Sequence, residues 1–232
     1  MRAQRPRDTV ENMPERTDTD MVPLFPLSSL LVPGLLLPLR LFEPRYLALA
    51  ADLLNVPADQ RQFGVVAIRH GREVGLAGGS ELYDIGTIAA VTDLSANTDG
   101  TFNVQTSGTR RFRILDLDVS KAYLRARVQF LTEPEGEGAS AWAQQVAVDF
   151  EQYRRVMGLA VNISEMAPEV LSYVVTAALV APIGDRQMLL SAPDTATRLA
   201  LAHRALRQEL SIMRVLASVP AVDLARSPVS VN

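Results

Sequence analysis

Residues 25–54 read FPLSSLLVPGLLLPLRLFEPRYLALAADLL, and the prolines and glycine in this stretch mark where the first elements of the fold begin and end. Pro33 and Gly34 predict a type II turn, because proline presets φ at the second turn position and glycine accepts a positive φ at the third. Apolar segments on either side of the turn predict strands over residues 22–27 and 35–41. The chain therefore opens with two strands joined by a turn.

Strand patterns dominate up to residue 131, with a single helix among them. Pro44 predicts the start of that helix, over residues 44–54, because the missing N–H of proline does no harm in the first helical turn. The segment ANTDG predicts a hairpin through its Asp-Gly ending. The further predicted strands cover residues 63–68, 86–94, 101–106 and 124–130.

A change of period separates this β-rich part from a helical part. Residues 133–139 (EPEGEGA) are acidic, contain proline and glycine and lack large apolar residues, so they predict a linker. Asp194 is expected at a helix start, and Trp142 is expected to pack between the two halves of the chain. The predicted helices cover residues 140–159, 168–181, 185–191 and 194–219. The second of them is apolar almost all round and should lie in the middle of a bundle.

Strands followed by helices predict the α+β class. The first twenty residues hold few large apolar side chains that could compensate the entropy of ordering, which predicts a disordered tail. Met21 stands where the ordered pattern begins, so Met1 and Met21 are alternative starts of translation. The predicted segments are a disordered tail (1–20), a β-rich subdomain (21–132), a linker (133–139), a helical bundle subdomain (140–220) and a flexible carboxyl terminus (221–232).

The composition excludes several kinds of chemistry. The chain of 232 residues has a formal net charge of −3, two histidines, no cysteine and one lysine, Lys121. Without cysteine there is no disulfide, thiol nucleophile or Cys-based metal site, and the lysine belongs to no G-x-x-x-x-G-K-[ST] phosphate-binding loop. Residues 21–42 are apolar but contain four prolines and Arg40, so we expect no membrane span. No signal peptide is recognised, which predicts a cytoplasmic protein.

Three segments match the pattern of a known family in order and spacing. The first is the opening stretch, with its F-P-L, P-G and L-P-L-x-x-F-E-x-R-Y elements. The second runs from FGVVAIRHGREVG through DIGTIAAVTDLSANTDGTFNVQTSGTRRFRI to YLRARVQFL, and the third is DRQMLLSAPDTATRLALAHRALRQEL. Together they resemble the Lon N-terminal domain family, also called the Lon substrate-binding domain, over about residues 21–219. The resemblance implies a PUA-like six-stranded pseudo-barrel followed by a C-terminal α-helical bundle.

The same resemblance bears on activity. Full Lon proteases add an ATPase domain and a peptidase domain with a Ser–Lys pair, and this chain resembles only their amino-terminal part. Ser120 adjoins Lys121, but in an extended segment the two side chains point to opposite sides. We therefore expect a non-enzymatic protein with no catalytic residues, metal or cofactor.

The candidate binding residues are Phe42, Glu43, Arg45 and Tyr46 at a strand-to-helix junction, with Arg110 and Arg111 as a basic rim. A carboxylate at a helix start is favoured by the helix dipole and can pair with an arginine. A capped helix start with an internal ion pair is the alternative for the first group. The leading hypothesis is a non-catalytic module that binds unfolded polypeptide segments, or one protein partner, in a groove between barrel and bundle. Such an adaptor or holding factor would use apolar contacts and free strand edges.

Two alternatives belong to other classes of protein. Arginines around Phe112 and on the strand over residues 124–130 suggest a PUA-like RNA-binding module, although the acidic balance of the chain gives no global reason to bind nucleic acid. Phe112 itself fits the barrel core. A hydrolase on the same scaffold is the second alternative, and it needs a polar cluster that the sequence does not show. His70 and His203 lack a histidine partner at metal spacing, and no G-x-S-x-G occurs. Asp116 and Asp118 indicate a solvated strand edge more than a metal site. The arginines are Arg110, Arg111, Arg113, Arg125 and Arg127.

Overall fold

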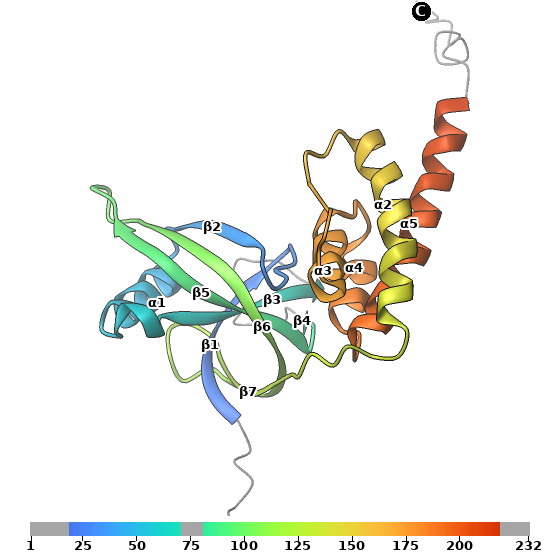
Figure 1. Ribbon diagram of the computed structural model, residues 1–232. Coiled ribbons are helices and arrows are strands. Elements are labelled where there is room, and N and C mark those ends of the chain that lie inside the picture. Colours follow the sequence, from blue (N-terminus) through green and yellow to red (C-terminus); the bar gives the residue numbers. More distant parts are fainter. Residues whose placement is uncertain (1–18, 71–80, 219–232) are drawn as a thin grey trace, which may run out of the picture.

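A β-rich half and a helical half lie side by side in the computed structural model, which describes residues 19–70 and 81–218 (Figure 1). The strands are β1 (Thr19–Leu27), β2 (Leu36–Leu41), β3 (Gln62–His70), β4 (Glu81–Leu82), β5 (Ile85–Ala96), β6 (Phe102–Asp118) and β7 (Arg125–Phe130). Helix α1 (Pro44–Leu54) and the 3-10 helix η1 (Ala58–Gln60) lie between β2 and β3. The helical half holds α2 (Ala139–Met157), α3 (Pro168–Ala178), α4 (Ile183–Leu190) and α5 (Thr195–Ser218). None of these described helices is both long and apolar enough to cross a membrane.

Five of the strands close into a ring. β1, β7, β6, β5 and β3 pair in that order as antiparallel neighbours, and residues 64–67 of β3 return to residues 24–27 of β1 in parallel. β2 pairs with β6 and β4 pairs with β3, so these two strands are additions to the ring. The α+β class and the order of barrel before bundle are confirmed, with five ring strands and two further strands in place of a simple six-stranded barrel.

β6 is longer than its sequence pattern predicts. The expected strand over residues 101–106 continues to Asp118, because β6 pairs with β5 along its first part and with β7 along its second. A register shift between Gly108 and Arg111 interrupts the pairing with β5. Such an irregularity breaks the alternation of apolar and polar residues, so the sequence pattern does not predict the second part of the strand.

The turns and the helix predicted from proline and glycine occur where expected. Gly34 and Gly100 have φ angles of 82° and 80°, as their turns require. α1 covers the predicted residues 44–54, with Pro44 in its first turn. Local chemistry alone therefore places these elements correctly.

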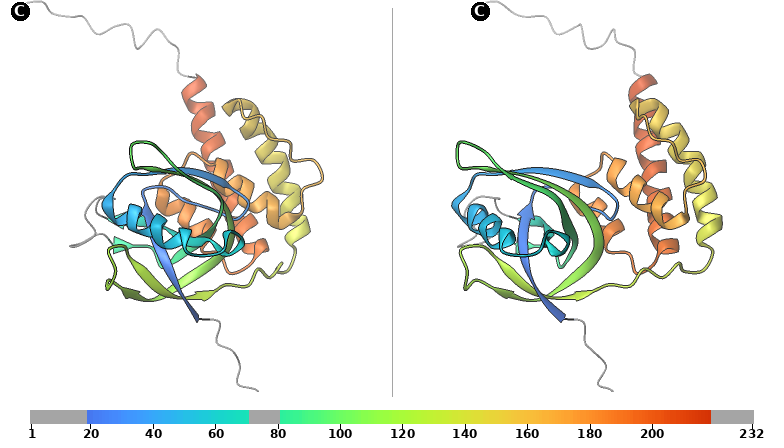
Figure 2. Two further views of the ribbon diagram at one scale, coloured as in Figure 1. Left: turned by 90° about the vertical axis from the view of Figure 1, so that its left-hand side faces the viewer. Right: turned by 60° about the vertical axis from the view of Figure 1, so that its left-hand side comes forward.

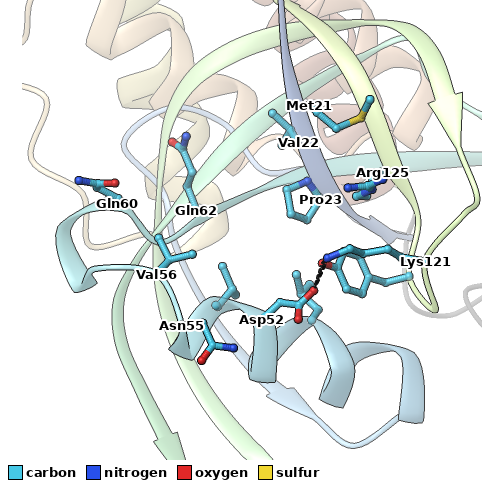
Figure 3. Close-up of a pocket in the computed structure, with 13 residues that line it drawn as sticks. Met21, Val22, Pro23, Asp52, Asn55, Val56, Gln60, Gln62, Lys121 and Arg125 are labelled. Carbon is cyan, nitrogen blue, oxygen red and sulfur yellow. Dashed lines mark hydrogen bonds and ion pairs between the residues drawn. The ribbon is translucent and has the colours of Figure 1, made fainter.

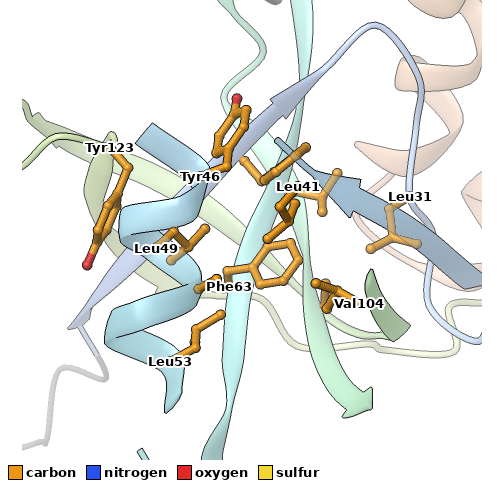
Figure 4. Packing of buried hydrophobic residues seen from close by; sticks show 12 residues of the cluster. Leu31, Leu41, Tyr46, Leu49, Leu53, Phe63, Val104 and Tyr123 are labelled. Atoms are coloured by element: carbon orange, nitrogen blue, oxygen red, sulfur yellow. The ribbon is translucent and has the colours of Figure 1, made fainter. Parts of the chain in front are cut away.

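Phe112 lies fully buried inside the barrel, which confirms its predicted place in the core. A Cβ on Gly86 would lie 2.4 Å from the Val65 carbonyl oxygen and 2.6 Å from the Phe112 ring, so a strand glycine makes room for that ring. At one end of the barrel, α1 packs Leu49 and Leu53 into the core cluster that contains Phe63 (Figure 4). α1 therefore closes the barrel interior at that end.

In the helical half, α2 and α5 run side by side (Figure 2) and α3 contacts α2, α4 and α5. The predicted central place of α3 is therefore confirmed. Trp142 packs against the bundle core, with its ring centroid 5.7 Å from that of His203, so its predicted position between the two halves is wrong. Other apolar residues form the contact between the two halves. Val32 and Ile85 of the barrel pack against Tyr173 and Leu190 of the bundle.

The predicted tails over residues 1–20 and 221–232 fall outside the described residues, except that Thr19 and Asp20 already belong to β1. The predicted linker over residues 133–139 joins β7 to α2, which begins at Ala139.

Candidate functional site

The predicted binding residues at the start of α1 are built largely into the barrel. Tyr46 is 5% exposed and stacks on Phe25, with ring centroids 4.0 Å apart. The Arg45 guanidinium lies 4.4 Å from the centre of the Tyr46 ring, and its Nη2 lies 2.9 Å from Glu43 Oε2. Phe42, by contrast, is 66% exposed. The ion pair agrees with the alternative interpretation, but its other part is wrong, because the Glu43 side chain makes no capping hydrogen bond to α1. Of this group, Phe42 is the side chain best placed to meet a partner.

The structure does not bring this group together with Arg110 and Arg111. β2 pairs with β6 so that Leu41, next to Phe42, is opposite Phe102. Arg111 lies nine residues further along β6, which is about 30 Å of strand at about 3.3 Å per residue. The group at the start of α1 therefore lies beside the beginning of β6, whereas Arg110 and Arg111 lie near the middle of that strand.

Arg111 is 1% exposed, so it does not form an exposed basic rim, and this part of the prediction is wrong. Arg111 is paired with Thr87 across the strands, on the face of β5 and β6 that the bundle covers. Its Nη1 donates to the carbonyl oxygens of Leu190 at 2.5 Å and Ala192 at 2.7 Å. Arg111 thus ties the barrel to the carboxyl-terminal end of α4.

A second buried arginine meets Arg111 at one carboxylate. Glu133 of the linker accepts from Arg111 Nε at 2.6 Å and from Arg198 Nη2 of α5 at 3.1 Å. Arg198 is fully buried and also donates to Ser172 Oγ at 3.1 Å, while its guanidinium lies 4.1 Å from the centre of the Tyr173 ring. We call Arg111, Glu133, Tyr173 and Arg198 the junction cluster, because together they join barrel, linker, α3 and α5.

The electrostatics of the junction cluster follow from its burial. Burial would raise the pKa of Glu133, but the hydrogen bond from Arg111 and the charges of Arg111 and Arg198 outweigh it, so the pKa lies below its ordinary value of 4.5. Burial lowers the pKa of Arg198 and raises that of Tyr173. Sequence reasoning missed this cluster. The sequence feature that could have revealed it is Arg198, a charged residue next to Leu199, where the apolar stripe of α5 begins.

An apolar groove of about 420 Å³ opens between the barrel and the bundle. We call it the junction groove. One wall is the turn at Pro33 and Gly34, and the other is α3 with the segment before it. The side chains include that of Tyr173, which also belongs to the junction cluster, and that of Val170, which is 49% exposed. The groove is lined by Val32, Pro33, Gly34, Leu35, Leu159, Val161, Val170, Tyr173, Val174, Ala177 and Ala178. A groove between the two halves was predicted, but its walls come from residues that the prediction did not name.

A second pocket, of about 510 Å³, lies at the closed end of the barrel beside β1 (Figure 3). We call it the β1 pocket. Asp52 of α1 accepts hydrogen bonds there from Tyr123 Oη at 2.5 Å and Lys121 Nζ at 2.6 Å. These bonds, first that of Lys121 and then that of Tyr123, lower the pKa of Asp52. The carboxylate in turn raises the pKa of Lys121.

Two of the five arginines considered for RNA binding are occupied by carboxylates. Arg111 pairs with Glu133, and Arg125 pairs with Asp118. Arg110 is exposed and lies 3.4 Å above the centre of the Phe130 ring. Arg113 and Arg127 are exposed as well. The surface therefore presents fewer of these five arginine charges than the sequence suggests.

Three of the residues weighed for catalysis or metal binding lie next to a side chain of opposite charge: Lys121, His203 and Asp118. A lysine that acts as a base needs a depressed pKa, whereas Asp52 raises that of Lys121. His203 Nδ1 lies 2.8 Å from Asp149 Oδ2 on α2, and the side chain of His70 lies outside the described residues. Among the residues that the structure describes, no three His, Asp or Glu side chains gather as a metal site would require. Asp118 is held by Arg125.

Comparisons with known proteins point to one family. A family model described as the ATP-dependent protease La (LON) substrate-binding domain matches residues 21–208. Lon protease 2 of Sorangium cellulosum is 28% identical over 221 residues, and Lon protease of Anaeromyxobacter dehalogenans is 30% identical over 152 residues. These alignments cover 90% and 65% of this chain but 27% and 16% of the two proteases. The chain thus spans at most about a quarter of the length of these curated relatives.

Solved structures agree in fold. A Lon N-terminal domain protein from Xanthomonas campestris has a TM-score of 0.55 at 27% identity, covering 83% of this chain and 98% of that one. The N-terminal domain of a Mycobacterium avium complex Lon protease has a TM-score of 0.60 at 15% identity, covering 81% and 98%, and shows likeness of fold alone. With the family model matching most of the described residues, this chain belongs to the LON substrate-binding domain family.

Proposed function

We propose that this protein binds exposed apolar segments of unfolded polypeptides in the junction groove and performs no chemistry on them. The observation that carries the proposal is the groove itself, which is open, apolar and free of charged lining residues. The family is described as substrate-binding, and the relatives carrying the same domain are proteases, for which polypeptides are the substrates. An adaptor or holding role in protein quality control is the function that this site supports best.

The chemistry of the groove suits a ligand of variable sequence. Burial of apolar surface contributes about 25 cal/mol per Å² and has no directional requirement, so many apolar side chains gain similar free energy. The junction cluster holds the α3 wall in place before binding, because Glu133 accepts from both Arg111 of the barrel and Arg198, and Arg198 donates to Ser172 of α3. A preformed apolar groove without charges therefore favours broad selection by hydrophobicity over recognition of one sequence.

The test is a titration of a labelled, permanently unfolded polypeptide with this protein at physiological salt, followed by fluorescence anisotropy. Val170→Asp places a charge in the groove at a side chain that is already 49% exposed, so the fold should tolerate it. We expect the affinity to fall about tenfold or more, because an approaching apolar segment would have to desolvate the carboxylate. Val148→Asp is the matched control, since Val148 is 71% exposed on α2 and outside the groove. Equal affinity for both variants would contradict the proposal.

The predicted rim at the start of α1 remains a separate proposal for the same function. Phe42→Ala tests it without disturbing the contact of Arg45 with the buried Tyr46 ring, because Phe42 is 66% exposed. A loss of affinity in Phe42→Ala with none in Val170→Asp would move the binding surface to that end of the barrel.

Salt dependence separates polypeptide binding from RNA binding. A groove without charged walls should bind its ligand with little dependence on ionic strength, whereas RNA held by Arg110, Arg113 and Arg127 would be lost steeply as salt rises. A single-stranded RNA that binds more tightly than the unfolded polypeptide, with a steep salt slope, would favour the RNA-binding alternative.

A further inference from the structure

We infer that this protein has a second polypeptide contact, at which an extended segment adds as a strand to the open edge of β1 and lies over the β1 pocket. The inference rests on the proposed function in that its ligand is again a polypeptide. It uses a different surface from the junction groove and a different chemistry, main-chain hydrogen bonds in place of apolar burial.

The first half of β1 has one paired edge. Residues 19–23 pair with β7, and on the other edge β1 pairs with β3 only over residues 24–27. β3 begins at Gln62, and the chain before it turns away through η1. The same register places Gln62, the first residue of β3, opposite Val22, so among the strands that the structure describes none continues along the second edge of residues 19–21. An unpaired strand edge is a template for another extended chain.

The main-chain groups of Met21 face this open edge. The Leu24 N–H donates to the Leu124 carbonyl oxygen at 2.7 Å, on the β7 side of β1. Main-chain groups alternate between the two edges of a strand, so those of Val22 face β7 and those of Met21 face the β1 pocket. Met21 lines that pocket and is 51% exposed (Figure 3).

The β1 pocket offers groups that suit a peptide backbone. Asn55, Gln60 and Gln62 contribute amides, which can both donate to and accept from peptide groups. Leu49 and Leu53 of α1 give the pocket an apolar floor. The volume of about 510 Å³ leaves space beside β1 for side chains of an added segment.

The charges of the pocket argue against a small anion as its ligand. Lys121 Nζ is paired with Asp52, and Arg125 is paired with Asp118, so both cations already have a carboxylate partner. An anion would have to compete with these carboxylates, whereas a neutral peptide group would not. The amides and the open edge therefore favour an extended polypeptide.

Pro23 limits the length of the contact. Proline has no N–H to donate, and it stands where β1 passes from the open edge to the pairing with β3. We expect a short segment that binds through the main-chain groups of Thr19 and Met21, which face the same edge of β1.

The experiment uses Lys121, the single lysine of the chain, as a reporter of the pocket. The rate of acetylation of Lys121 by an amine-reactive reagent is measured by mass spectrometry, with and without a permanently unfolded polypeptide that contains no lysine. If the polypeptide covers the pocket, acetylation should slow about tenfold at a ligand concentration near ten times Kd, because reaction then needs the free form.

Met21→Pro removes the N–H that faces the pocket without removing a hydrogen bond to β7, and prolines are tolerated at strand edges. Met21→Ala keeps the N–H and is the matched control. We expect the protection of Lys121 to be lost in Met21→Pro and kept in Met21→Ala. In the wild-type protein, hydrogen exchange of the Met21 amide should also slow on binding, which tests the inference independently of the proline variant.

The outcomes separate the two proposals. Anisotropy that shows binding sensitive to Val170→Asp, with no protection of Lys121 or equal protection in Met21→Pro, would overturn the strand addition alone. No binding of any unfolded polypeptide by anisotropy would overturn the proposed function.

Discussion

Glu133 holds two buried guanidiniums with one carboxylate, since Arg111 is 1% exposed and Arg198 fully buried. At the level of single residues this is the densest arrangement of charge in the described interior. A buried charge that loses its partner is costly, because neither water nor a counterion replaces the lost interaction. Loss of the Glu133 carboxylate should therefore destabilise the protein more than its position in an acidic linker suggests.

Glu133→Gln keeps the shape of the side chain and removes its charge. Arg111 and Arg198 would then repel each other without a shared anion, and we expect the free energy of unfolding to fall by about 3–5 kcal/mol. Chemical denaturation measures the change. Glu137→Gln, which removes an exposed charge from the same linker, should change stability by no more than about 0.5 kcal/mol. Similar small effects in both variants would show that the cluster contributes little.

The same residue gives stability a pH dependence. Because the folded state lowers the pKa of Glu133 below 4.5, its carboxylate contributes stability above that pH. That contribution is lost as the pH falls below 4.5 through the folded-state pKa. The difference in unfolding free energy between wild type and Glu133→Gln should therefore be largest near neutral pH and become smaller as the pH falls below 4.5. A difference that stays constant from neutral to acid pH would contradict this assignment.

At the level of elements, α5 begins with a side-chain cap. Asp194 Oδ1 accepts from the Thr197 N–H at 2.6 Å, at the helix start that the sequence predicts. Asp194→Ala should cost about 0.5–2 kcal/mol of stability by denaturation, because an N–H of the first turn loses its acceptor. Asp194→Asn keeps an acceptor and should lose much less, so an equal loss in both variants would exclude capping as the cause.

At the level of the whole molecule, barrel and bundle are joined by the junction cluster and by the apolar contacts around Tyr173 and Leu190. Tryptophan and lysine each occur once in the chain. Trp142 therefore reports on the unfolding of the bundle, and Lys121 on that of the barrel. If the halves unfold as one unit, their transitions coincide.

We therefore expect the denaturation curve from Trp142 fluorescence and that from the reactivity of Lys121 to overlap in the wild-type protein. Arg111→Ala removes the link from β6 to Glu133 and α4, so the two curves should separate. Separate transitions in the wild type would show that the two halves unfold independently. Coincident transitions in Arg111→Ala would show that other contacts couple them.

The sequence by itself determined the features that depend on neighbouring residues. Pro33 and Gly34 determine the first turn, Pro44 the start of α1 and Asp194 the start of α5, because turn and cap geometry are local. The apolar periods that follow these signals predict strands before helices, and the family resemblance adds the barrel and the bundle.

Only the tertiary structure decided which surface is available for binding. The sequence predicts Arg111 as part of an exposed basic rim. In the structure Arg111 is buried, because the bundle covers its face of β6. The second part of β6 is a strand because β7 pairs with it, although a register shift breaks its local pattern. Burial and pairing depend on residues far apart in the chain, so the junction groove and the open edge of β1 cannot be derived from local sequence.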